Sequence, residues 1–154
     1  VIKERIQKSD CAKGYILDGF PRNLQQAELF GDKMKELDYL IELTIPEDLI
    51  MRRLTGRRTC KNCSAIYNID PECAPHPKKE GVCDKCNGLL YQREDDTQEA
   101  IMKRLRIYNE ETQPVIKKYK QKVKIIDSSG SPEENFNRVL EIIEKKKAIT
   151  RKKK

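Results

Sequence analysis

The chain has 154 residues, of which 37% are charged and 37% apolar, and lysine and arginine exceed aspartate and glutamate by 7. This length suits one ordinary domain with room for a small inserted module. No apolar run approaches the roughly 20 residues that a membrane-spanning helix needs, which excludes an integral membrane protein of that kind. The basic excess fits a partner that carries phosphates, although charge alone does not say which one. Part of it lies in the tail at 145–154, which reads as a solvated end, with nucleic-acid or membrane-surface binding as the alternative.

The first third of the chain alternates between helical and extended patterns. Residues 1–11 are expected to be the end of a helix, and because they contain neither a starting methionine nor a signal peptide, we expect the chain to be a fragment. The apolar run at 15–17 predicts a short buried strand that ends at Asp18-Gly19. Asn23 can cap a helix over 24–37, whose apolar residues recur at helical spacing: Leu24, Ala27, Phe30, Met34 and Leu37. Residues 39–45 predict a second strand, and Pro46 opens a helix that runs to Leu54.

Residues 57–93 differ in kind from the rest. They hold five of the six cysteines and show little periodicity, which predicts a small module inserted into the host domain. After it, Thr97 can cap a long helix that carries Ile101, Leu105 and Tyr108 on one face and that Pro114 is expected to break or kink. Residues 123–127 predict a third strand and 128–132 a loop. The last helix is predicted at 133–147, and its inner stripe is Phe136, Val139, Leu140 and Ile143.

Strands that alternate with helices predict an α/β fold, with a parallel sheet flanked by helices. We expect a core domain over 1–56 and 94–154, and the inserted module over 57–93. Only three strands are visible, and a stable sheet of this type usually has more. The core is therefore expected to be partial.

Four cysteines form two Cys-x-x-Cys pairs, Cys60 with Cys63 and Cys83 with Cys86, which are separated by 19 residues. This is the spacing of a zinc ribbon, in which two tight turns supply four sulfurs to one tetrahedral Zn²⁺. Four thiolates leave no open coordination position, so we expect a structural zinc that does not activate water. Unligated thiols or disulfides are the alternatives, but the absence of a secretory signal favours metal and a reducing compartment. Cys73 and His76, at Cys-x-x-His spacing, could compete as ligands.

Further polar motifs flank this module. The turn Asp18-Gly19-Phe20-Pro21-Arg22 follows a predicted strand, and ligands of open α/β sheets gather at the carboxyl ends of strands. An aspartate there can hold Mg²⁺ through water and an arginine can bind a phosphate with two donors, whereas a surface turn with a salt bridge is the alternative. The run Arg52-Arg53-Leu54-Thr55-Gly56-Arg57-Arg58 precedes the module, and Arg93-Glu94-Asp95-Asp96 follows it, with Arg104 further along the next helix.

With these motifs the sequence resembles adenylate kinase, of the form whose lid binds zinc. The resemblance covers essentially the whole chain, and its most specific part is Gly14-Tyr15-Ile16-Leu17-Asp18-Gly19-Phe20-Pro21-Arg22. It implies a P-loop-type parallel sheet, whose central strand and phosphate loop are missing from these residues, and a zinc-ribbon lid at 57–93. The chain departs from the family pattern in three places: the loop near Gly130 is about one residue longer, the segment between Cys63 and Cys83 is a few residues longer, and Asn68 stands where the family often has histidine.

The resemblance also implies roles for matching residues. On the AMP side, Arg22 would hold the phosphate and Gln26 would read the adenine. Asp18 would position, through water, the Mg²⁺ that accompanies ATP. On the ATP side, Arg53 would lie against the adenine and Arg57 would hold the phosphates, with further contacts from Tyr67 and from the loop at Ser131. Arg93 and Arg104 would clamp the phosphates, AMP included, and act with Arg57 in catalysis. Asp95 and Asp96 would help to lock the closed lid.

The implied activity is reversible phosphoryl transfer between ATP and AMP, giving two ADP. We expect a cytoplasmic protein that is monomeric at full length and binds neither membranes nor nucleic acid. The family's phosphate loop, G-x-x-G-x-G-K, does not occur in this sequence, so the chain alone is expected to be inactive and poorly folded outside the zinc module. Three alternatives stay open: a nucleic-acid-binding zinc ribbon, a kinase for another nucleoside monophosphate such as UMP or CMP, and a structural or partner-binding remnant.

Overall fold

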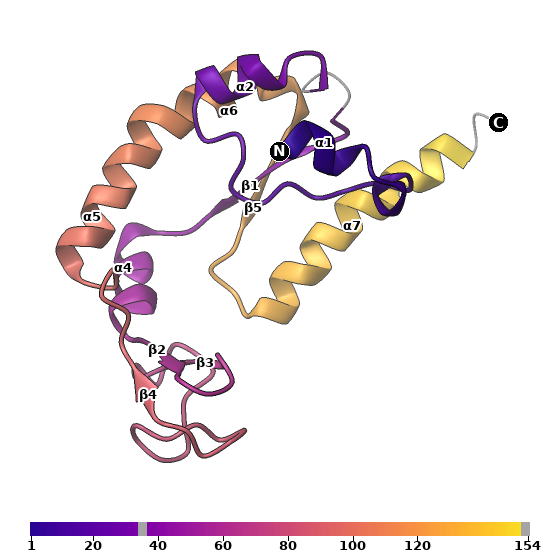
Figure 1. The fold of residues 1–154 in the computed structure, drawn as a ribbon. Coiled ribbons are helices and arrows are strands. Elements are labelled where there is room, and N and C mark those ends of the chain that lie inside the picture. Colours follow the sequence, from indigo (N-terminus) through magenta and orange to yellow (C-terminus); the bar gives the residue numbers. More distant parts are fainter. Residues whose placement is uncertain (34–36, 152–154) are drawn as a thin grey trace. The chain divides into compact units, whose positions relative to one another are not determined.

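The computed structural model describes residues 1–33 and 37–151, with side chains described up to Glu144 (Figure 1). The chain divides into two compact units, which we describe separately. The first comprises Val1–Leu40 and Leu105–Lys124, and the second comprises Ile41–Arg104 and Ile125–Lys154. None of the helices in the described part of the chain is long and apolar enough to cross a membrane.

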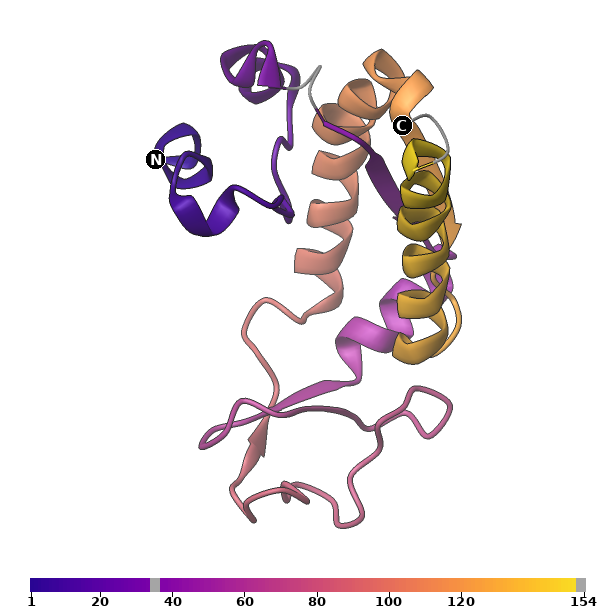
Figure 2. The ribbon, with the colours of Figure 1, turned by 90° about the vertical axis from the view of Figure 1, so that its right-hand side faces the viewer.

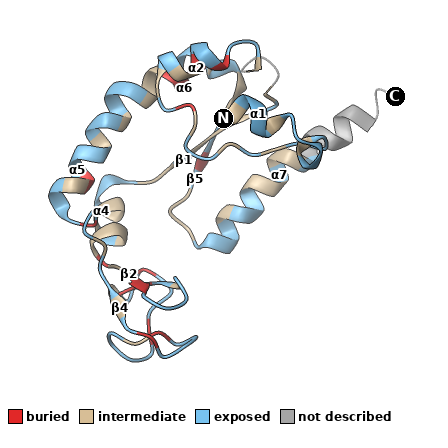
Figure 3. Ribbon diagram, viewed as in Figure 1, coloured by how far each residue is buried: buried red, intermediate tan, exposed pale blue. Residues whose placement is uncertain are grey.

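The first unit is helical. It contains α1 (Ile2–Ile6), a 3-10 turn (Ser9–Cys11), α2 (Leu24–Phe30), a π-helical turn (Tyr108–Thr112), α6 (Gln113–Lys118) and a further 3-10 turn (Lys120–Lys122). Its core joins Ala27 and Phe30 of α2 to Val115 of α6, and partly buried apolar residues of α1 and of the loop before α2 pack around them (Figure 3). Phe20 meets Phe30 edge to face, with ring centroids 5.6 Å apart, a geometry that aromatic pairs favour.

Two predictions for this unit are wrong. Residues 15–17 do not form a strand, and Ile16 is 90% exposed. A strand needs a hydrogen-bonded neighbour, and no segment in the described ranges pairs with these residues. The helix predicted over 24–37 ends at Phe30, because Gly31 takes a positive φ of 59° that ends the helical ladder. Met34, which was expected on that helix, lies outside the described residues.

Helix α2 begins where its sequence predicts. The side chain of Asn23 accepts a hydrogen bond from the backbone N–H of Gln26 at 2.9 Å, as an N-cap does. This cap fixes the start of the helix directly after the Asp18–Arg22 turn. The positions of Arg22 and Gln26 relative to one another follow from it.

The second unit contains a small parallel sheet. Strand β1 (Leu40–Thr44) pairs with β5 (Val123–Asp127), and each strand begins in the first unit and ends in the second. The backbone N–H of Ser128 donates to the carbonyl of Thr44 at 2.8 Å, which holds the two carboxyl ends together. The helices α4 (Glu47–Thr55) and α7 (Pro132–Arg151) follow β1 and β5 in the chain (Figure 1). The α/β class and the second and third predicted strands are thus confirmed.

Residues 57–93, called the lid below, form a second sheet. Its order is β3-β2-β4, all antiparallel, with β2 at Arg57–Cys60, β3 at Ile66–Asn68 and β4 at Leu90–Tyr91. Loops make up the rest of the lid (Figure 2). Its core consists of Cys60, Tyr67 and Cys83, with Ala65 and Leu90 packed against them. So few apolar side chains bury little surface, which is why such a module depends on a metal or another cross-link. The predicted domain boundaries at 56 and 94 stay a prediction.

The two long helices depart from prediction in detail. At Pro114, where a break or kink is expected, the α-helix is interrupted by a π-helical turn: α5 (Gln98–Ile107) runs into this turn and then into α6, which has the proline in its first turn. A proline is tolerated there because its missing N–H falls where the ladder is already widened. In α7, Val139, Leu140 and Ile143 are half-buried as predicted, whereas Phe136 is 60% exposed.

Candidate active site and metal centre

The four cysteines of the two Cys-x-x-Cys pairs converge on one point. Their sulfur atoms all lie within 4.8 Å of one another, and three pairs are closer: Cys60 to Cys86 at 3.5 Å, Cys63 to Cys83 at 3.6 Å, and Cys63 to Cys86 at 3.4 Å. A disulfide requires about 2.0 Å, so these are free thiols. Zinc–sulfur bonds of about 2.3 Å make the edge of an S₄ tetrahedron about 3.8 Å. The cluster has the size that a structural zinc requires.

The two cysteine turns have the same backbone geometry. In each, the N–H of the first cysteine donates to the carbonyl five residues on, from Cys60 to Ala65 at 2.8 Å and from Cys83 to Gly88 at 2.9 Å. The residue after each second cysteine, Ser64 or Asn87, takes a left-handed φ of 59° or 57°. Two such turns facing each other present four sulfurs to a shared centre. Gly88 is required at this point, because a Cβ there would lie 3.0 Å from the Cys60 sulfur and 2.9 Å from the Asn62 side chain.

The alternative ligands lie elsewhere. Neither Cys73 nor His76 belongs to the cluster within the described part of the chain. Cys73 is buried, and the His76 ring donates from Nδ1 to the carbonyl of Asn68 at 2.9 Å. The metal site that the sequence predicts is therefore the one formed by Cys60, Cys63, Cys83 and Cys86.

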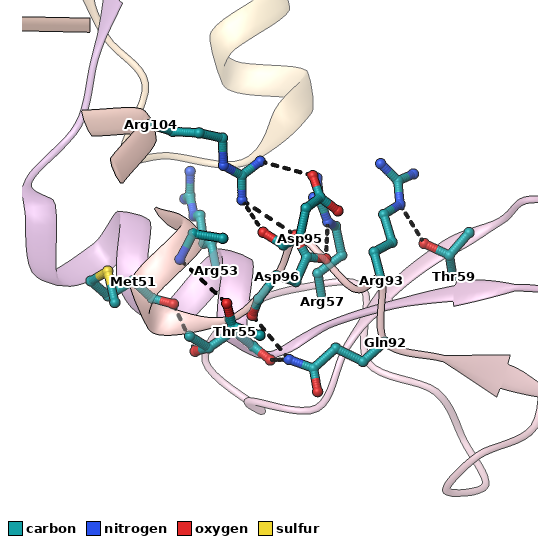
Figure 4. Close-up of polar contacts among 12 residues, drawn as sticks. Met51, Arg53, Thr55, Arg57, Thr59, Gln92, Arg93, Asp95, Asp96 and Arg104 are labelled. Carbon is teal, nitrogen blue, oxygen red and sulfur yellow. Dashed lines mark hydrogen bonds and ion pairs between the residues drawn. The ribbon is translucent and has the colours of Figure 1, made fainter. Parts of the chain in front are cut away.

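A second polar centre forms around Asp96, where the chain leaves the lid. Arg57, at the start of β2, donates to its carboxylate from Nε at 2.8 Å and from Nη2 at 2.5 Å (Figure 4). Arg104, on α5, places Nη2 3.6 Å from the same carboxylate and donates to the Asp95 carbonyl at 2.6 Å. The Asp96 side chain is 0% exposed, against 20% for Arg57 and 43% for Arg104. We call Arg57, Asp95, Asp96 and Arg104 the Asp96 cluster.

Electrostatics keep Asp96 ionised. Burial raises the pKa of this carboxyl. The hydrogen bonds from Arg57 and the charges of Arg57, Arg104 and Arg93 lower it by more, so the net pKa lies below the ordinary value. The same contact raises the pKa of Arg57, chiefly through its hydrogen bonds to Asp96. Asp96 therefore fixes the direction of the Arg57 guanidinium and attracts the charges of Arg104 and Arg93, because a buried carboxylate needs cationic partners.

Two residues, Arg93 and Gln92, join this cluster to its surroundings. Arg93 donates from Nε to the Thr59 hydroxyl at 3.2 Å, and its carbonyl accepts from the backbone N–H of Asp96 at 3.1 Å. The Gln92 amide bridges the carbonyl of Thr55, at the end of α4, and the carbonyl of Asp96, at 3.1 and 3.0 Å. Arg57 and Arg104 thus meet at one buried carboxylate, while the Arg93 side chain is bonded to Thr59 and affects Asp96 only through its charge (Figure 4).

Arg53 occupies a different place in the same unit. From α4 it donates to the backbone carbonyls of the loop after β5: Ser128 at 2.9 Å, Ser129, and Gly130 at 3.1 Å. The Asn135 amide binds two of these carbonyls from the other side, at 3.0 and 3.3 Å. The pair shapes the loop that the sequence marks as longer than usual.

The remaining predicted residues, Asp18, Arg22 and Gln26, lie in the first unit. Asp18 is exposed after the extended segment at 15–17. The Arg22 backbone N–H donates to the Gln26 side chain at 2.7 Å, and its Nε donates to the Gly19 carbonyl at 2.8 Å. Arg22 and Gln26 are therefore neighbours. The convergence of all five arginines on one ligand involves both units and stays a prediction.

Comparison with known proteins decides the family. The model of the adenylate kinase family matches residues 1–124. Similar proteins include the adenylate kinases of Thermodesulfovibrio yellowstonii, 47% identical over 152 residues (95% of this chain and 69% of that protein), and of Syntrophobacter fumaroxidans, 43% identical over 151 residues (93% and 68%). The enzyme of Archaeoglobus fulgidus is 46% identical over 135 residues (85% and 61%). This chain belongs to the adenylate kinase family. It spans between 61% and 69% of the length of these three relatives.

Two residues to which the family resemblance assigns ATP contacts are engaged within the chain. The Tyr67 hydroxyl is buried and lies 3.5 Å from the Cys83 sulfur. Ser131 forms a capping box with Glu134: its N–H donates to the Glu134 carboxylate at 2.6 Å, and its hydroxyl accepts from the Glu134 N–H at 3.2 Å. Their contacts with ATP stay predictions.

Sequence reasoning missed the residues that join the lid to α4. Asn68, where adenylate kinases often have histidine, donates to the Arg53 carbonyl at 2.9 Å and accepts from the Asp70 N–H at 2.9 Å. Arg52 then binds Asp70 at 2.8 Å and Glu72 at 2.6 Å. The sequence contains a signal for these turns, Asn-x-Asp-x-Glu at 68–72. The Asn68 and Asp70 side chains each accept a hydrogen bond from the backbone N–H two residues further on. Such alternation predicts consecutive turns, here folded against the end of a helix.

Proposed function

We propose that the protein to which this chain belongs catalyses reversible phosphoryl transfer between ATP and AMP, giving two ADP. Family membership supports the reaction class. The observation within the chain that carries the proposal is the Asp96 cluster, where Arg57 and Arg104 are fixed on a buried carboxylate beside the lid. Phosphoryl transfer needs oriented cations and exclusion of water more than it needs covalent chemistry from the protein.

Each arginine has a separate task in this proposal. Asp96 holds Nε and Nη2 of Arg57, so we assign Nη1 to a phosphate oxygen of ATP. Arg104, on α5, and Arg93, at the end of the lid, bind the phosphoryl group in transfer and the AMP phosphate. Guanidinium groups suit these tasks because they stay charged and bind phosphate with two donors. When the lid closes, water is excluded and each contact strengthens.

Substrate binding is shared with other residues. Arg22 binds the AMP phosphate, and Gln26 reads the adenine beside it. Arg53 and the loop at Ser128–Ser131 line the ATP adenine, with a further contact from Tyr67. Asp18 holds Mg²⁺ through water, and the bound Mg²⁺ would neutralise phosphate charge. We place the reaction in the cytoplasm, which suits a protein with six free thiols.

We assign a structural Zn²⁺ to Cys60, Cys63, Cys83 and Cys86. The sulfur spacing supports four-coordinate binding, which leaves no position for substrate. When bound, the ion would cross-link the lid without taking part in the reaction. The lid residues themselves carry Arg57 and Arg93 and orient them through Asp96 and Thr59.

A hybrid protein tests the proposal. The residues of the Thermodesulfovibrio yellowstonii enzyme that lie before its match to this chain are fused to Val1 of the 154-residue chain. We expect this hybrid to convert ATP and AMP to ADP, with UMP and CMP as poor acceptors, and the chain without the added segment to be inactive. A folded, zinc-loaded hybrid that forms no ADP would refute the proposal. Preference for UMP or CMP would instead identify another nucleoside monophosphate kinase.

A further inference from the structure

The hydrogen bonds of Tyr67 connect the lid core to one metal ligand. Its side chain is 5% exposed, and its hydroxyl oxygen lies 3.5 Å from the sulfur of Cys83, which is 0% exposed. The backbone N–H of Asp84 donates to the same hydroxyl oxygen at 3.0 Å. Tyr67 is therefore placed between the Cys83 sulfur and the turn that carries Cys83.

The metal assignment sets the direction of the hydroxyl proton. The Tyr67 oxygen accepts from the Asp84 N–H and keeps its own O–H to donate, and a thiolate that binds zinc has no proton to give, so the Cys83 sulfur is the acceptor.

The four cysteine sulfurs differ in their need for hydrogen-bond donors from the protein. Cys63 and Cys86 are exposed, so water can solvate their sulfurs, whereas Cys60 and Cys83 are buried. Four thiolates around one Zn²⁺ leave a net charge of about −2, which is costly to bury without hydrogen-bond donors. Backbone N–H groups of the turns supply some of them, and at Cys83 the Tyr67 hydroxyl adds a side-chain donor.

We infer that Tyr67 is a positioning residue of the zinc site, whose hydroxyl donates to the Cys83 thiolate and sets how tightly the lid holds its metal. This inference rests on the metal assignment of the proposed function and not on the kinase reaction. Partners that hydrogen-bond to metal ligands commonly change metal affinity by about 10- to 100-fold. Tyr67 would thus act on the metal through Cys83, whether or not it also contacts ATP.

The test compares two tyrosine-to-phenylalanine variants of the complete chain. Tyr67→Phe keeps the ring in the lid core and removes only the hydroxyl. The matched control is Tyr91→Phe on β4, in the same lid, whose ring faces the Lys61 ammonium, 6.0 Å from its centroid. Zinc affinity is measured by competition with a chromogenic chelator, and the Co²⁺-loaded proteins are compared by their sulfur-to-cobalt absorption bands, which report the charge on the ligands.

Tyr67→Phe is expected to weaken zinc binding by about 10-fold or more and to shift the sulfur-to-cobalt bands, whereas Tyr91→Phe leaves both near the wild-type values. Equal affinity and identical bands in the two variants would overturn the inference and leave Tyr67 a packing residue. If Tyr67→Phe fails to fold, hydrogen exchange in the metal-loaded wild type decides. A Tyr67 hydroxyl proton that exchanges slowly supports the bond, and one that exchanges as fast as an exposed phenol overturns it.

These measurements need no nucleotide, so they are separate from the test of the proposed function. A wild-type chain that binds no zinc would overturn the metal assignment and this inference together. Tight zinc binding in a hybrid that forms no ADP would overturn the kinase proposal alone.

Discussion

The Asp96→Asn substitution tests the geometry of the Asp96 cluster. It preserves the shape of the side chain and removes the charge that Arg57 and Arg104 share. Asp96 is 0% exposed and Arg57 only 20%, so the two charges meet largely out of water. Breaking a buried pair by removing one partner costs about 3–5 kcal/mol, because the other charge is left without compensation.

The expected loss lies at the lower end of that range. Arg57 is partly exposed and Arg104 is 43% exposed, so water can recover part of their solvation. We therefore expect a loss of about 3 kcal/mol. For a protein of about 150–250 residues each kcal/mol lowers Tm by about 2–4 °C, so Asp96→Asn should lower Tm by about 6–12 °C.

The assay is thermal unfolding of the zinc-loaded hybrid, followed by circular dichroism. The control is Asp95→Asn, the adjacent carboxylate, which is 62% exposed and lies 3.3 Å from Arg104. A surface pair of this kind contributes about 0–1 kcal/mol, so the control should lower Tm by less than about 4 °C. Equal shifts in the two variants would refute the claim that Asp96 is the buried centre of the cluster.

The same variant predicts a pH dependence. The pKa of Asp96 is lowered in the folded protein, so its stabilisation is complete above the unfolded pKa and is lost as pH falls through the folded pKa. The Tm difference between wild type and Asp96→Asn should therefore stay constant from about pH 8 to about pH 5. A difference that already shrinks within this window would contradict the lowered pKa.

Three further predictions concern Arg57 and Arg104, the metal and a helix cap. In the hybrid, Arg57→Ala or Arg104→Ala should lower kcat/KM by about 10²-fold or more, as expected for the loss of a donor to the transition state. The control Arg106→Ala, at an exposed position of α5, should have little effect. Steady-state kinetics measures these values, and losses of only a few-fold would count against both assignments. Cys60→Ser should lower Tm more than it lowers turnover at low temperature, and the reverse order would indicate a catalytic metal. Ser131→Ala should lower Tm by roughly 2–4 °C, because it removes the cap of α7, and an unchanged melting curve would show that the capping box contributes nothing.

Local signals predicted much of the fold. Pro46 before acidic residues marked the start of α4, the β-branched run at 123–127 marked β5, and Asn23 marked the cap of α2. At Pro46 and Asn23, one residue removes or satisfies a backbone group at the start of a helix. The four cysteines that converge in the lid were equally predictable, because the spacing within each Cys-x-x-Cys turn is local.

Features that depend on distant residues were not predictable in this way. Residues 15–17 have a strand-like sequence but no neighbour in the described chain, and the pairing partner decides whether a strand forms. The burial of Asp96 depends on Arg57, which lies 39 residues earlier. Family resemblance indicated that both residues matter, but not that one carboxylate would be enclosed. Hydrophobic periodicity likewise does not reveal the π-helical turn before Pro114.

The central claim is that the protein transfers phosphoryl groups between adenine nucleotides, and that guanidinium groups at a metal-bound lid bind the phosphates during the transfer. Its most direct test is ADP production by the hybrid from ATP and AMP, followed as zinc is removed and restored. The predicted result is production that largely persists at low temperature without zinc, is lost on warming at a lower temperature than in the zinc-loaded hybrid, and regains its thermal resistance when zinc is restored. A hybrid that is folded and zinc-bound, binds both nucleotides and yields no ADP would contradict the claim.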